Sequence, residues 1–388
     1  MSAPKQRNVV IALSSIMSIR MLGLFMILPV FSVYAAQIPH ATTTLIGIAL
    51  GIYGLTQACL QIPFGMLSDH IGRKPVIFAG LCLLLIGSVV AAFSHSIYFL
   101  ILGRALQGAG AIGSTVLALL ADLTPENERG KAMAFIGLSI GCAFMIAMIA
   151  GPTINHYFHL SGIFFVTAAF SLIAMLLVST VPTPKHLDNI HVEKKRFSEV
   201  IRNAQLLKLD AGIFSLHLIL TALFVAMPIL LTHEMHLSET HQILLYLCVL
   251  IISFVLAVPF IVFAEKKQKM KPVFVSAVFF IAIVQMGFYF CYQHVTAAIC
   301  LLLIFFTAFT LLEALLPSLV SKTVPPKNKG AAMGIYSSSQ FLGIFIGGTL
   351  GGLTYAHAHA HGVFALCATI GLMWFLISCT QFKSHKNT

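Results

Sequence analysis

Long apolar stretches alternate with short polar connectors along the whole chain. A helix that crosses a membrane needs about 20 consecutive, mostly apolar residues. Twelve stretches meet this requirement, and the predicted spans are 8–34, 42–66, 75–94, 97–121, 131–154, 161–181, 211–232, 241–264, 273–293, 296–320, 331–356 and 362–381. The pattern predicts an all-α polytopic membrane protein with twelve transmembrane helices.

Most connectors between the predicted spans are too short to hold a soluble domain. The longest polar stretch, 183–210, contains the run Lys194-Lys195-Arg196 and lies between the sixth and seventh spans. We expect it to be a cytoplasmic linker, partly an amphipathic helix, between a six-helix bundle at 1–182 and a second at 211–388. The first span is too long for the apolar region of a signal peptide, so we expect it to be retained.

The basic residues are distributed unevenly over the connectors. When the connectors are assigned alternately to two sides, all but two of the 23 Lys and Arg residues fall on one side. The exceptions, Arg20 and Arg104, lie inside spans. Because Lys and Arg accumulate in cytoplasmic loops, the pattern predicts an even number of spans and cytoplasmic N- and C-termini.

Composition narrows the class of protein further. Hydrophobic residues make up 59% of the chain and charged residues only 9%, against roughly 25% charged residues in an ordinary soluble domain. This excludes a soluble enzyme, a disordered protein and a nucleic-acid binder, despite a net charge of +11. The eight cysteines all lie in or at the ends of apolar spans, where they are expected to pack as small hydrophobic residues.

An internal repeat relates the two halves of the chain. The connector after the fourth span contains Pro125, Arg129, Gly130, Ala132 and Met133, and Pro, a base, Gly, Ala and Met recur 200 positions later. A weaker echo relates the connectors after the second and eighth spans. The repeat predicts two halves with parallel pseudo-symmetry, and such transporters carry their substrate site at the interface of the repeats.

Three short segments resemble motifs of the major facilitator superfamily. The connector Gly65-Met-Leu-Ser-Asp69-His-Ile-Gly72-Arg73-Lys74 resembles motif A, and Arg104-Ala-Leu-Gln107-Gly108-Ala-Gly110 resembles motif B. Pro29-Val30 in the first span is similar to the proline motif of the twelve-span drug:proton antiporters. The likeness covers nearly the whole chain and is closest to the YajR-like branch.

The resemblance implies a multi-pass protein of the bacterial inner membrane. It implies a small-molecule substrate, a proton gradient in place of a cofactor, and a monomer in the lipid bilayer. Members of the branch can carry a further soluble domain at the C-terminus, which we expect this chain to lack. The chain departs from the antiporter motif of the fifth span, of which only Gly151-Pro152 is retained.

The motif A residues predict a gate at the cytoplasmic ends of the helices. Gly65 and Gly72 permit close helix approach and a tight turn. Asp69 can accept hydrogen bonds at a helix N-terminus or pair with a base, and Arg73 is expected to pair with Asp122 at the end of span four. We expect a latch that forms in the outward-facing state and breaks in the inward-facing state. Topogenic charge alone would account for Lys74.

Two ionisable residues inside the second half are candidates for proton coupling. A charge at the bilayer centre costs at least about 2.5–3.5 kcal/mol, so such residues are functional candidates. Glu313 is the only charged residue between Phe305 and Leu316 and could take up and release a proton. His217 can change its charge near neutral pH. The alternatives are a structural ion pair or hydrogen bond for Glu313, and a neutral imidazole hydrogen-bonded between helices for His217.

A further set of polar residues is expected to include the lining of a substrate cavity. Arg20 and Arg104 could each bind an anionic group of a substrate or bind backbone carbonyls, and both interpretations stay open. The same holds for the uncharged polar residues, which could line the cavity or form hydrogen bonds between helices. This uncharged set comprises Gln57, Gln107, Tyr336 and Gln340.

Histidines are concentrated in connectors on the side that lacks Lys and Arg. His357-Ala-His359-Ala-His361 resembles a metal-binding tract. Because neither a carboxylate nor a cysteine accompanies it, we expect polar loop residues and predict no metal site.

Taken together, these patterns predict a proton-coupled secondary active transporter that exports drugs or small amphipathic metabolites by alternating access. A proton-driven importer of a small solute is the first alternative. A membrane receptor that does not transport is the second. The sequence contains no catalytic constellation that would indicate an enzyme, and it does not identify the substrate.

Overall fold

The computed structural model describes residues 3–183, 199–325 and 328–381, and all regular elements in these ranges are helical. In chain order the elements are α1 (Ala3–Phe25), α2 (Phe31–Ala35), α3 (Thr43–Ile71), α4 (Arg73–Ala92), α5 (Ile97–Ala109), α6 (Gly113–Leu123), α7 (Glu126–Thr180), α9 (Ala204–Ile229), the π-helix η1 (Leu230–Glu234), α10 (Glu239–Lys266), α11 (Met270–Cys291), α12 (Val295–Thr323) and α13 (Lys329–Gln381). The prediction of an all-α membrane protein is confirmed.

Ten helical stretches in the described part of the chain are long and apolar enough to cross a membrane. Two of them, 53 and 52 residues long, are more than twice the length that one crossing needs. Each contains one break in the helical backbone, at His159 in α7 and at Ala358–His359 in α13. These two helices therefore supply four crossings, which gives the twelve that were predicted. The predicted loops between those spans are single backbone breaks.

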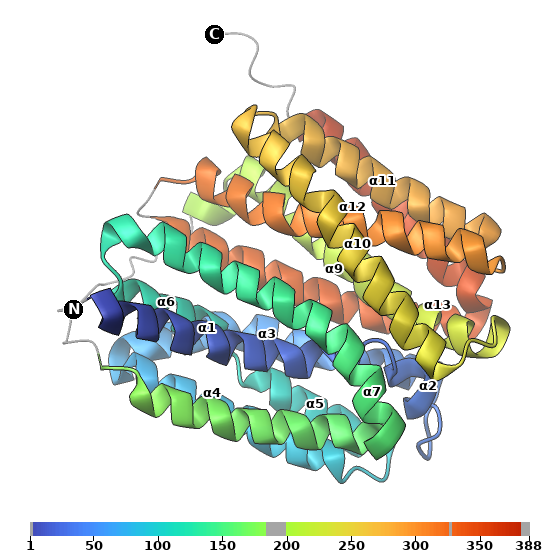
Figure 1. Ribbon diagram of the computed structural model, residues 1–388, viewed down its shortest axis with the longest axis horizontal. Coiled ribbons are helices and arrows are strands. Elements are labelled where there is room, and N and C mark those ends of the chain that lie inside the picture. Colours follow the sequence, from blue (N-terminus) through green and yellow to red (C-terminus); the bar gives the residue numbers. More distant parts are fainter. Residues whose placement is uncertain (1–2, 184–198, 326–327, 382–388) are drawn as a thin grey trace. The chain divides into compact units, whose positions relative to one another are not determined.

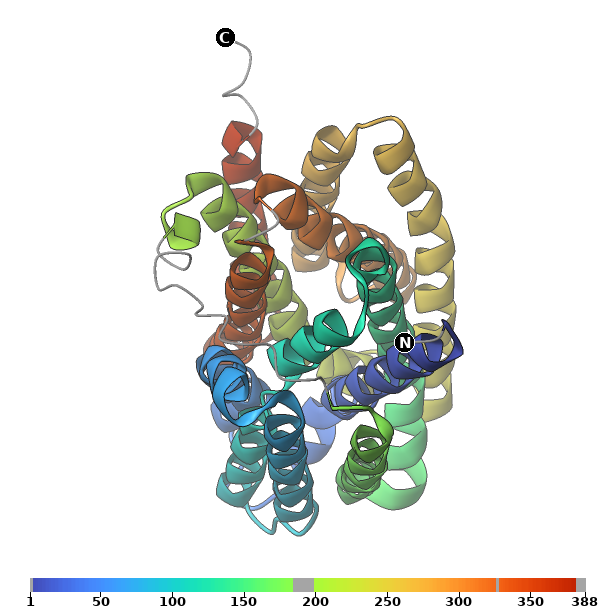
Figure 2. The ribbon, with the colours of Figure 1, turned by 90° about the vertical axis from the view of Figure 1, so that its left-hand side faces the viewer.

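The chain divides into two compact units. The first comprises Met1–Ala41 and Ile52–His191, and the second comprises Thr42–Gly51 and Val192–Thr388. In the first unit α1 runs alongside α7 and α4 runs alongside α5 (Figure 1). In the second unit α9 packs mainly against α13, and a short turn joins α10 to α11, in gold in Figure 2.

Helix breaks occur where the local sequence removes or redirects backbone hydrogen bonds. The first predicted span is interrupted between α1 and α2, where Pro29 lacks an N–H group. The fourth predicted span is interrupted between α5 and α6, where Gly110, the last residue of motif B, caps the C-terminus of α5. Both interruptions fall inside stretches that the hydrophobic pattern alone joined into one span.

Four histidines near helix ends have a left-handed backbone conformation. His40, His159, His236 and His359 have φ values of 65°, 57°, 51° and 49°. His159 and His359 are separated by the 200 positions of the main repeat, and His40 and His236 by the 196 positions of the weaker echo. The two halves thus end corresponding helices with the same residue type in the same backbone conformation.

The predicted linker needs one correction. Residues 184–198, including Lys194-Lys195-Arg196, lie outside the described part of the chain, but 204–210 form the first turns of α9. The side chain of Asn203 caps this helix by accepting hydrogen bonds from the backbone N–H groups of Gln205 and Leu206, at 3.0 and 3.2 Å. Asp210, predicted to be a linker residue, is therefore a residue of a membrane-spanning helix.

Candidate functional site

A polar cluster in the second unit joins three helices. His217 on α9 is 2% exposed, and its Nε2 atom lies 2.8 Å from Nε2 of Gln340 on α13. The same nitrogen lies 3.6 Å from Oε1 of Glu313 on α12, an oxygen that is fully buried. The structure therefore brings together the two residues predicted for proton coupling, together with one residue predicted for the cavity.

The contacts of His217 define its neutral tautomer. The amide nitrogen of Gln340 can only donate, so Nε2 of the neutral imidazole accepts and the ring proton is on Nδ1. Nδ1 faces the carbonyl oxygen of Ile213 at 3.3 Å, one turn earlier on the same helix. On protonation Nε2 becomes a donor, and Glu313 Oε1 is the acceptor beside it. The neutral imidazole thus bonds to Gln340, and a protonated imidazole can also pair with Glu313.

A row of glycines positions this cluster by letting α13 approach α9 closely. Gly343, Gly347 and Gly351 recur every four residues and therefore lie on one face of α13. A Cβ atom at Gly343 or Gly347 would overlap the carbonyl oxygen of Phe214 or Leu218, and one at Gly351 would lie 2.9 Å from Cα of Ala222. These partners also recur every four residues, so the two helices run parallel with a fixed register.

A second polar network lies between α4 and α5 in the first unit. Arg104 donates from Nη1 to Oε1 of Gln107 at 2.8 Å, and Gln107 donates from Nε2 to the hydroxyl of Ser88 at 2.8 Å. The guanidinium also lies over the ring of Tyr53, 5.0 Å from its centroid. Arg104 and Gln107 are each 1% exposed. The bond from Gln107 to Ser88 joins α5 to α4, whereas Arg104 and Gln107 lie one turn apart on α5, and substrate contact by either residue stays a prediction.

Arg20 on α1 and Gln57 on α3 both lie near the start of α6, beside Gly113. Gln57 donates from Nε2 to Oε1 of Gln61 at 2.8 Å. A Cβ atom at Gly113 would lie 3.3 Å from Nη1 of Arg20 and 3.6 Å from Oε1 of Gln61, so this arginine and this glutamine meet beside the start of α6. Arg20 is 1% exposed and Gln57 is fully buried. Their predicted contact with substrate stays a prediction.

The motif A residues form a compact ionic group at the junction of α3 and α4. Arg73 donates from Nε to Asp122 Oδ2 at 3.0 Å, pairs with Asp69 through Nη1, and donates to the hydroxyl of Ser68 at 2.7 Å. The expected contact between Arg73 and Asp122 is thus present. Gly72 has φ 98° at the turn, a conformation that side chains disfavour.

Lys74 has a contact that the sequence did not indicate. Its Nζ atom donates to the carbonyl oxygens of Val181 and Ser179, at 2.6 and 3.3 Å. These carbonyls lie at the C-terminus of α7, where the helix dipole attracts a cation and the last carbonyls lack partners within the helix. Lys74 therefore connects motif A to the end of the sixth span, in addition to any topogenic role.

Gly65, the first residue of the motif, packs near Ser114, whose hydroxyl would lie 3.2 Å from an added Cβ atom.

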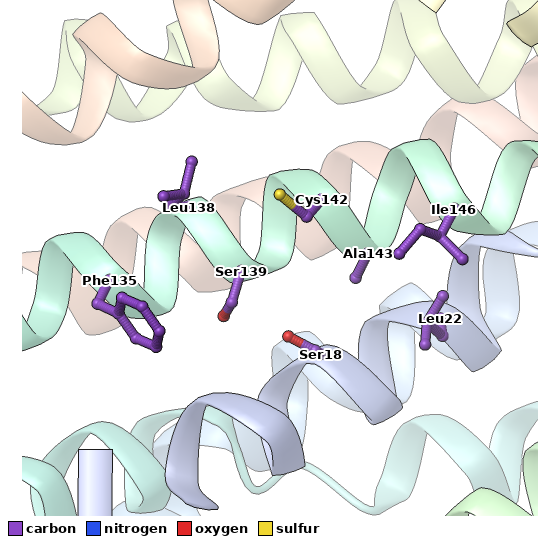
Figure 3. Close-up of a pocket in the computed structure, with 8 residues that line it drawn as sticks. All are labelled: Ser18, Leu22, Phe135, Leu138, Ser139, Cys142, Ala143 and Ile146. Atoms are coloured by element: carbon purple, nitrogen blue, oxygen red, sulfur yellow. The ribbon is translucent and has the colours of Figure 1, made fainter. Parts of the chain in front are cut away.

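A hollow of about 310 Å³ opens between α1 and α7 in the first unit, which is at the lower end of the range for small-molecule pockets. Figure 3 shows the hydroxyls of Ser18 and Ser139 directed into the space between the two helices. The remaining lining is apolar or sulfur-containing and comprises Leu22, Phe135, Leu138, Cys142, Ala143 and Ile146. None of the predicted cavity residues lines this hollow.

The three histidines of the 357–361 tract point to different partners. His357 Nδ1 lies 2.9 Å from the carbonyl oxygen of Leu353, the His359 ring contacts Tyr355, and the His361 ring contacts Tyr292. They lie in helix α13 around its break, whereas the sequence predicted polar loop residues. Among the described residues no group of three or more His, Cys, Asp or Glu residues is placed to hold a metal ion.

Asp210 is the buried ionisable residue that the sequence reasoning missed. It is 6% exposed and belongs to the same four-residue row of α9 as Phe214 and Leu218. The signal was available in the sequence, because Asn203 is a good N-cap and places Asp210 two turns inside the helix. The error came from ending the polar linker at its last charged residue.

These features define a polytopic membrane protein of two helical units, with ionisable side chains inside its spans. The sequence profile of the Major Facilitator Superfamily matches residues 13–209 and again 209–387. The chain therefore belongs to the Major Facilitator Superfamily. Proteins of this superfamily are transporters that bind small-molecule substrates within the membrane, and the chain is a transporter rather than an enzyme.

Individual relatives agree with this assignment. The chain is 46% identical to the inner membrane transport protein YajR of Escherichia coli K12 over 382 residues, which is 97% of this chain and 84% of that protein. It is 32% identical to the class B tetracycline resistance protein of Escherichia coli, over 34% of this chain and 33% of that protein. A bacterial homologue of the human lysosomal transporter Spinster, solved in an inward-facing and occupied conformation, shares the fold with a TM-score of 0.78 at 15% identity, over 98% of this chain and 97% of that one.

Proposed function

We propose that the protein is a proton-coupled secondary active transporter that exports small amphipathic molecules by alternating access. The observation that carries this proposal is the pair of His217 and Glu313, whose facing atoms lie 3.6 Å apart inside membrane-spanning helices. Burying such residues is costly, and they mark proton relays in membrane transporters. In a transporter of this superfamily, a proton relay would be coupled to transport by alternating access.

The coupling step moves one proton between two neighbouring groups. When Glu313 is protonated, its O–H bond can break as an N–H bond forms at Nε2 of neutral His217. The products are a carboxylate and an imidazolium, which attract each other. Before the transfer Nε2 accepts from Gln340, and afterwards it donates to Glu313. A change of proton occupancy therefore changes which of α12 and α13 is bound to α9.

Two observations bear on the direction of transport. The partial similarity to a tetracycline resistance protein supports export, although it covers a third of the chain. The reduced antiporter motif favours the second candidate, a proton-driven importer of a small solute. Gly151 of that motif packs against the carbonyl oxygen of Met26, close to the interruption after α1, so this position serves helix packing. A receptor that does not transport would leave the buried pair without a role.

The substrate contacts and the gate belong to the same proposal. Tyr336 and Gln340 in the second unit, and Arg20 and Gln57 in the first, are the proposed cavity residues. Arg104 and Gln107 bind each other and are proposed to support the packing of α4 and α5. The group formed by Asp69, Arg73, Lys74 and Asp122 is the proposed latch. We further propose a monomer in a bacterial inner membrane with both termini in the cytoplasm, in line with the charge distribution and with the location named for YajR.

Purified protein in vesicles with an imposed pH gradient tests the function. We expect the gradient to drive release of at least one solute from a panel of amphipathic drugs and small metabolites. Accumulation of solute together with protons would indicate the importer, and saturable binding without flux would indicate the receptor.

The variant Glu313→Gln tests which residue couples the proton. We expect it to abolish gradient-driven movement, because an amide of the same shape cannot release a proton. The matched control is Glu199→Gln, an exposed carboxyl whose oxygen Oε2 accepts from Asn328 at 3.3 Å and whose amide could still accept. Coupling that is unchanged in Glu313→Gln would refute the proposed role.

A further inference from the structure

Asp210 stands out among the buried ionisable groups that the proposed coupling step does not use. It is 6% exposed, and within residues 3–183, 199–325 and 328–381 the structure gives its carboxyl neither a hydrogen bond nor an ion pair. A carboxylate in a membrane-spanning helix without a paired cation is costly, and such residues mark proton pathways. The helix that carries Asp210 is the one that carries His217.

Helix geometry puts Asp210 and His217 on one face of α9. Seven residues correspond to nearly two turns, so the two side chains differ little in direction and are separated by about 10 Å along the axis. Asp210 also begins the four-residue row of Phe214, Leu218 and Ala222 that packs against the glycines of α13. It therefore faces α13 and not the lipid.

The register of the two helices identifies what lies opposite Asp210. Gly343 packs against Phe214, so one turn earlier Ser339 of α13 lies level with Asp210. Tyr336 is one turn before Gln340, is 5% exposed, and interacts electrostatically with both Asp210 and Glu313. Its hydroxyl can accept one proton while it donates another.

The ionisable groups around Asp210 come from three helices, α9, α12 and α13. Tyr336 on α13 is under the electrostatic influence of both Asp210 and Glu313 of α12, and His217 lies further along α9. Lys208 is on α9 as well but is partly exposed, and no bond joins it to Asp210 in the described residues. Asp210 lies nearer than His217 to the end of α9 that adjoins the basic connectors.

We propose that Asp210 is a second proton-carrying residue of this transporter, which exchanges protons with Glu313 through the hydroxyl of Tyr336. This inference rests on the proposed proton coupling and extends it toward the basic end of α9. In the transfer the O–H bond of the Asp210 carboxyl breaks as its proton passes to the Tyr336 oxygen, and Tyr336 releases its own proton to the Glu313 carboxylate. Asp210 becomes ionised, Glu313 becomes neutral, and Tyr336 is unchanged.

Time-resolved infrared spectroscopy of the full chain in lipid tests this route without a substrate, because a protonated carboxyl has its own C=O band. After a pH jump we expect two bands from buried carboxyls, one absent in Asp210→Asn and the other in Glu313→Gln. Loss of either Asp210 (Asp210→Asn) or the hydroxyl (Tyr336→Phe) should slow protonation of Glu313 by roughly a hundredfold, the lower end of the effect of a positioned proton-transfer group. Asp210→Glu should restore the rate in part, and Glu199→Gln should leave it unchanged.

The outcomes separate this inference from the proposed function. If Glu313 takes up its proton at the wild-type rate in Asp210→Asn and Tyr336→Phe, Asp210 is not part of the route, whereas coupling by Glu313 stands. If Glu313 shows no change of protonation in the wild-type protein, the proposed coupling fails and the inference fails with it. Asn replaces Asp with nearly the same shape, so correct insertion of that variant can be verified from its yield in the membrane.

Discussion

At the scale of single residues, the ionisable groups inside the spans differ in how many of their hydrogen-bonding atoms have a partner. Arg104 has Gln107 as an acceptor and the face of Tyr53 as a second contact. Glu313 has one imidazole at 3.6 Å, and its facing oxygen is otherwise without a hydrogen bond in the described residues. Because full satisfaction fixes a side chain and partial satisfaction leaves it able to change partner, the first arrangement suits packing and the second suits proton transfer.

The motif A group supports a prediction at the same scale. Asp69→Asn removes one of the two carboxylates that Arg73 binds and leaves Asp122 and Ser68 in place. The Arg73 and Asp69 side chains are 18% and 28% exposed, so the lost pair is worth up to about 1 kcal/mol. A change of this size shifts a two-state gate roughly fivefold. We expect transport in vesicles to fall severalfold while membrane insertion is unchanged.

The control for this prediction is Glu128→Gln. Glu128 pairs with Lys131 at 3.1 Å, also near the basic helix ends, but its partner is 79% exposed. We expect this variant to transport like the wild-type protein. Full activity of Asp69→Asn would show that the ion pair is not part of the gate.

At the scale of helices, contact between α9 and α13 depends on residues without side chains. Gly343, Gly347 and Gly351 bring the backbone of α13 against that of α9, and at this separation the side chain of Gln340 reaches His217. Small residues have this role in membranes because helix association there depends on close packing. The contact between His217 and Gln340 thus depends on the close helix approach that these glycines, about one to three turns beyond Gln340, permit.

Replacing one of these glycines tests the dependence. Gly347→Ala introduces a Cβ atom that would overlap the carbonyl oxygen of Leu218, so α13 must move away from α9. Overpacking of this kind typically costs about 1–3 kcal/mol. We expect a lower midpoint of thermal unfolding in detergent and weaker proton coupling in vesicles.

The same helix supplies a matched control in Gly334→Ala. No atom lies within 4 Å of a Cβ built at Gly334, and alanine is the better helix former by about 0.5–1 kcal/mol. This variant should be as stable as the wild-type protein or slightly more stable. Equal destabilisation by both substitutions would mean that the glycine row does not set the contact.

At the scale of the whole molecule, the one-sided distribution of Lys and Arg predicts the orientation of the chain. Fusions that end at Gln268, in the turn after α10, should carry a fluorescent protein that matures in the cytoplasm. Fusions that end at His294, just before α12, should instead carry an active periplasmic phosphatase. The opposite pattern at both positions would reverse the orientation, and activity of both reporters at one position would contradict a single orientation.

Hydrophobic pattern and charge predicted the class of fold because the bilayer restricts the backbone so strongly. A span must be helical and about 20 residues long, so twelve apolar stretches predict twelve crossings without knowledge of any contact. The pattern did not reveal that α7 and α13 each continue through a turn, or that α9 begins at Ala204. Those boundaries depend on capping and on the backbone conformation of single residues such as Asn203 and His159.

The sequence by itself determined that this is a membrane transporter with a few costly charges inside its spans, since hydropathy and charge act residue by residue. It also identified His217, Glu313, Arg73 and Asp122 as candidates. Only the tertiary structure decided which residues meet: His217 with Gln340 and Glu313, Gln107 with Ser88, and Lys74 with the end of α7. The reason is that these contacts depend on the register and separation of helices distant in the chain, which are set by packing of whole faces and not by any local pattern.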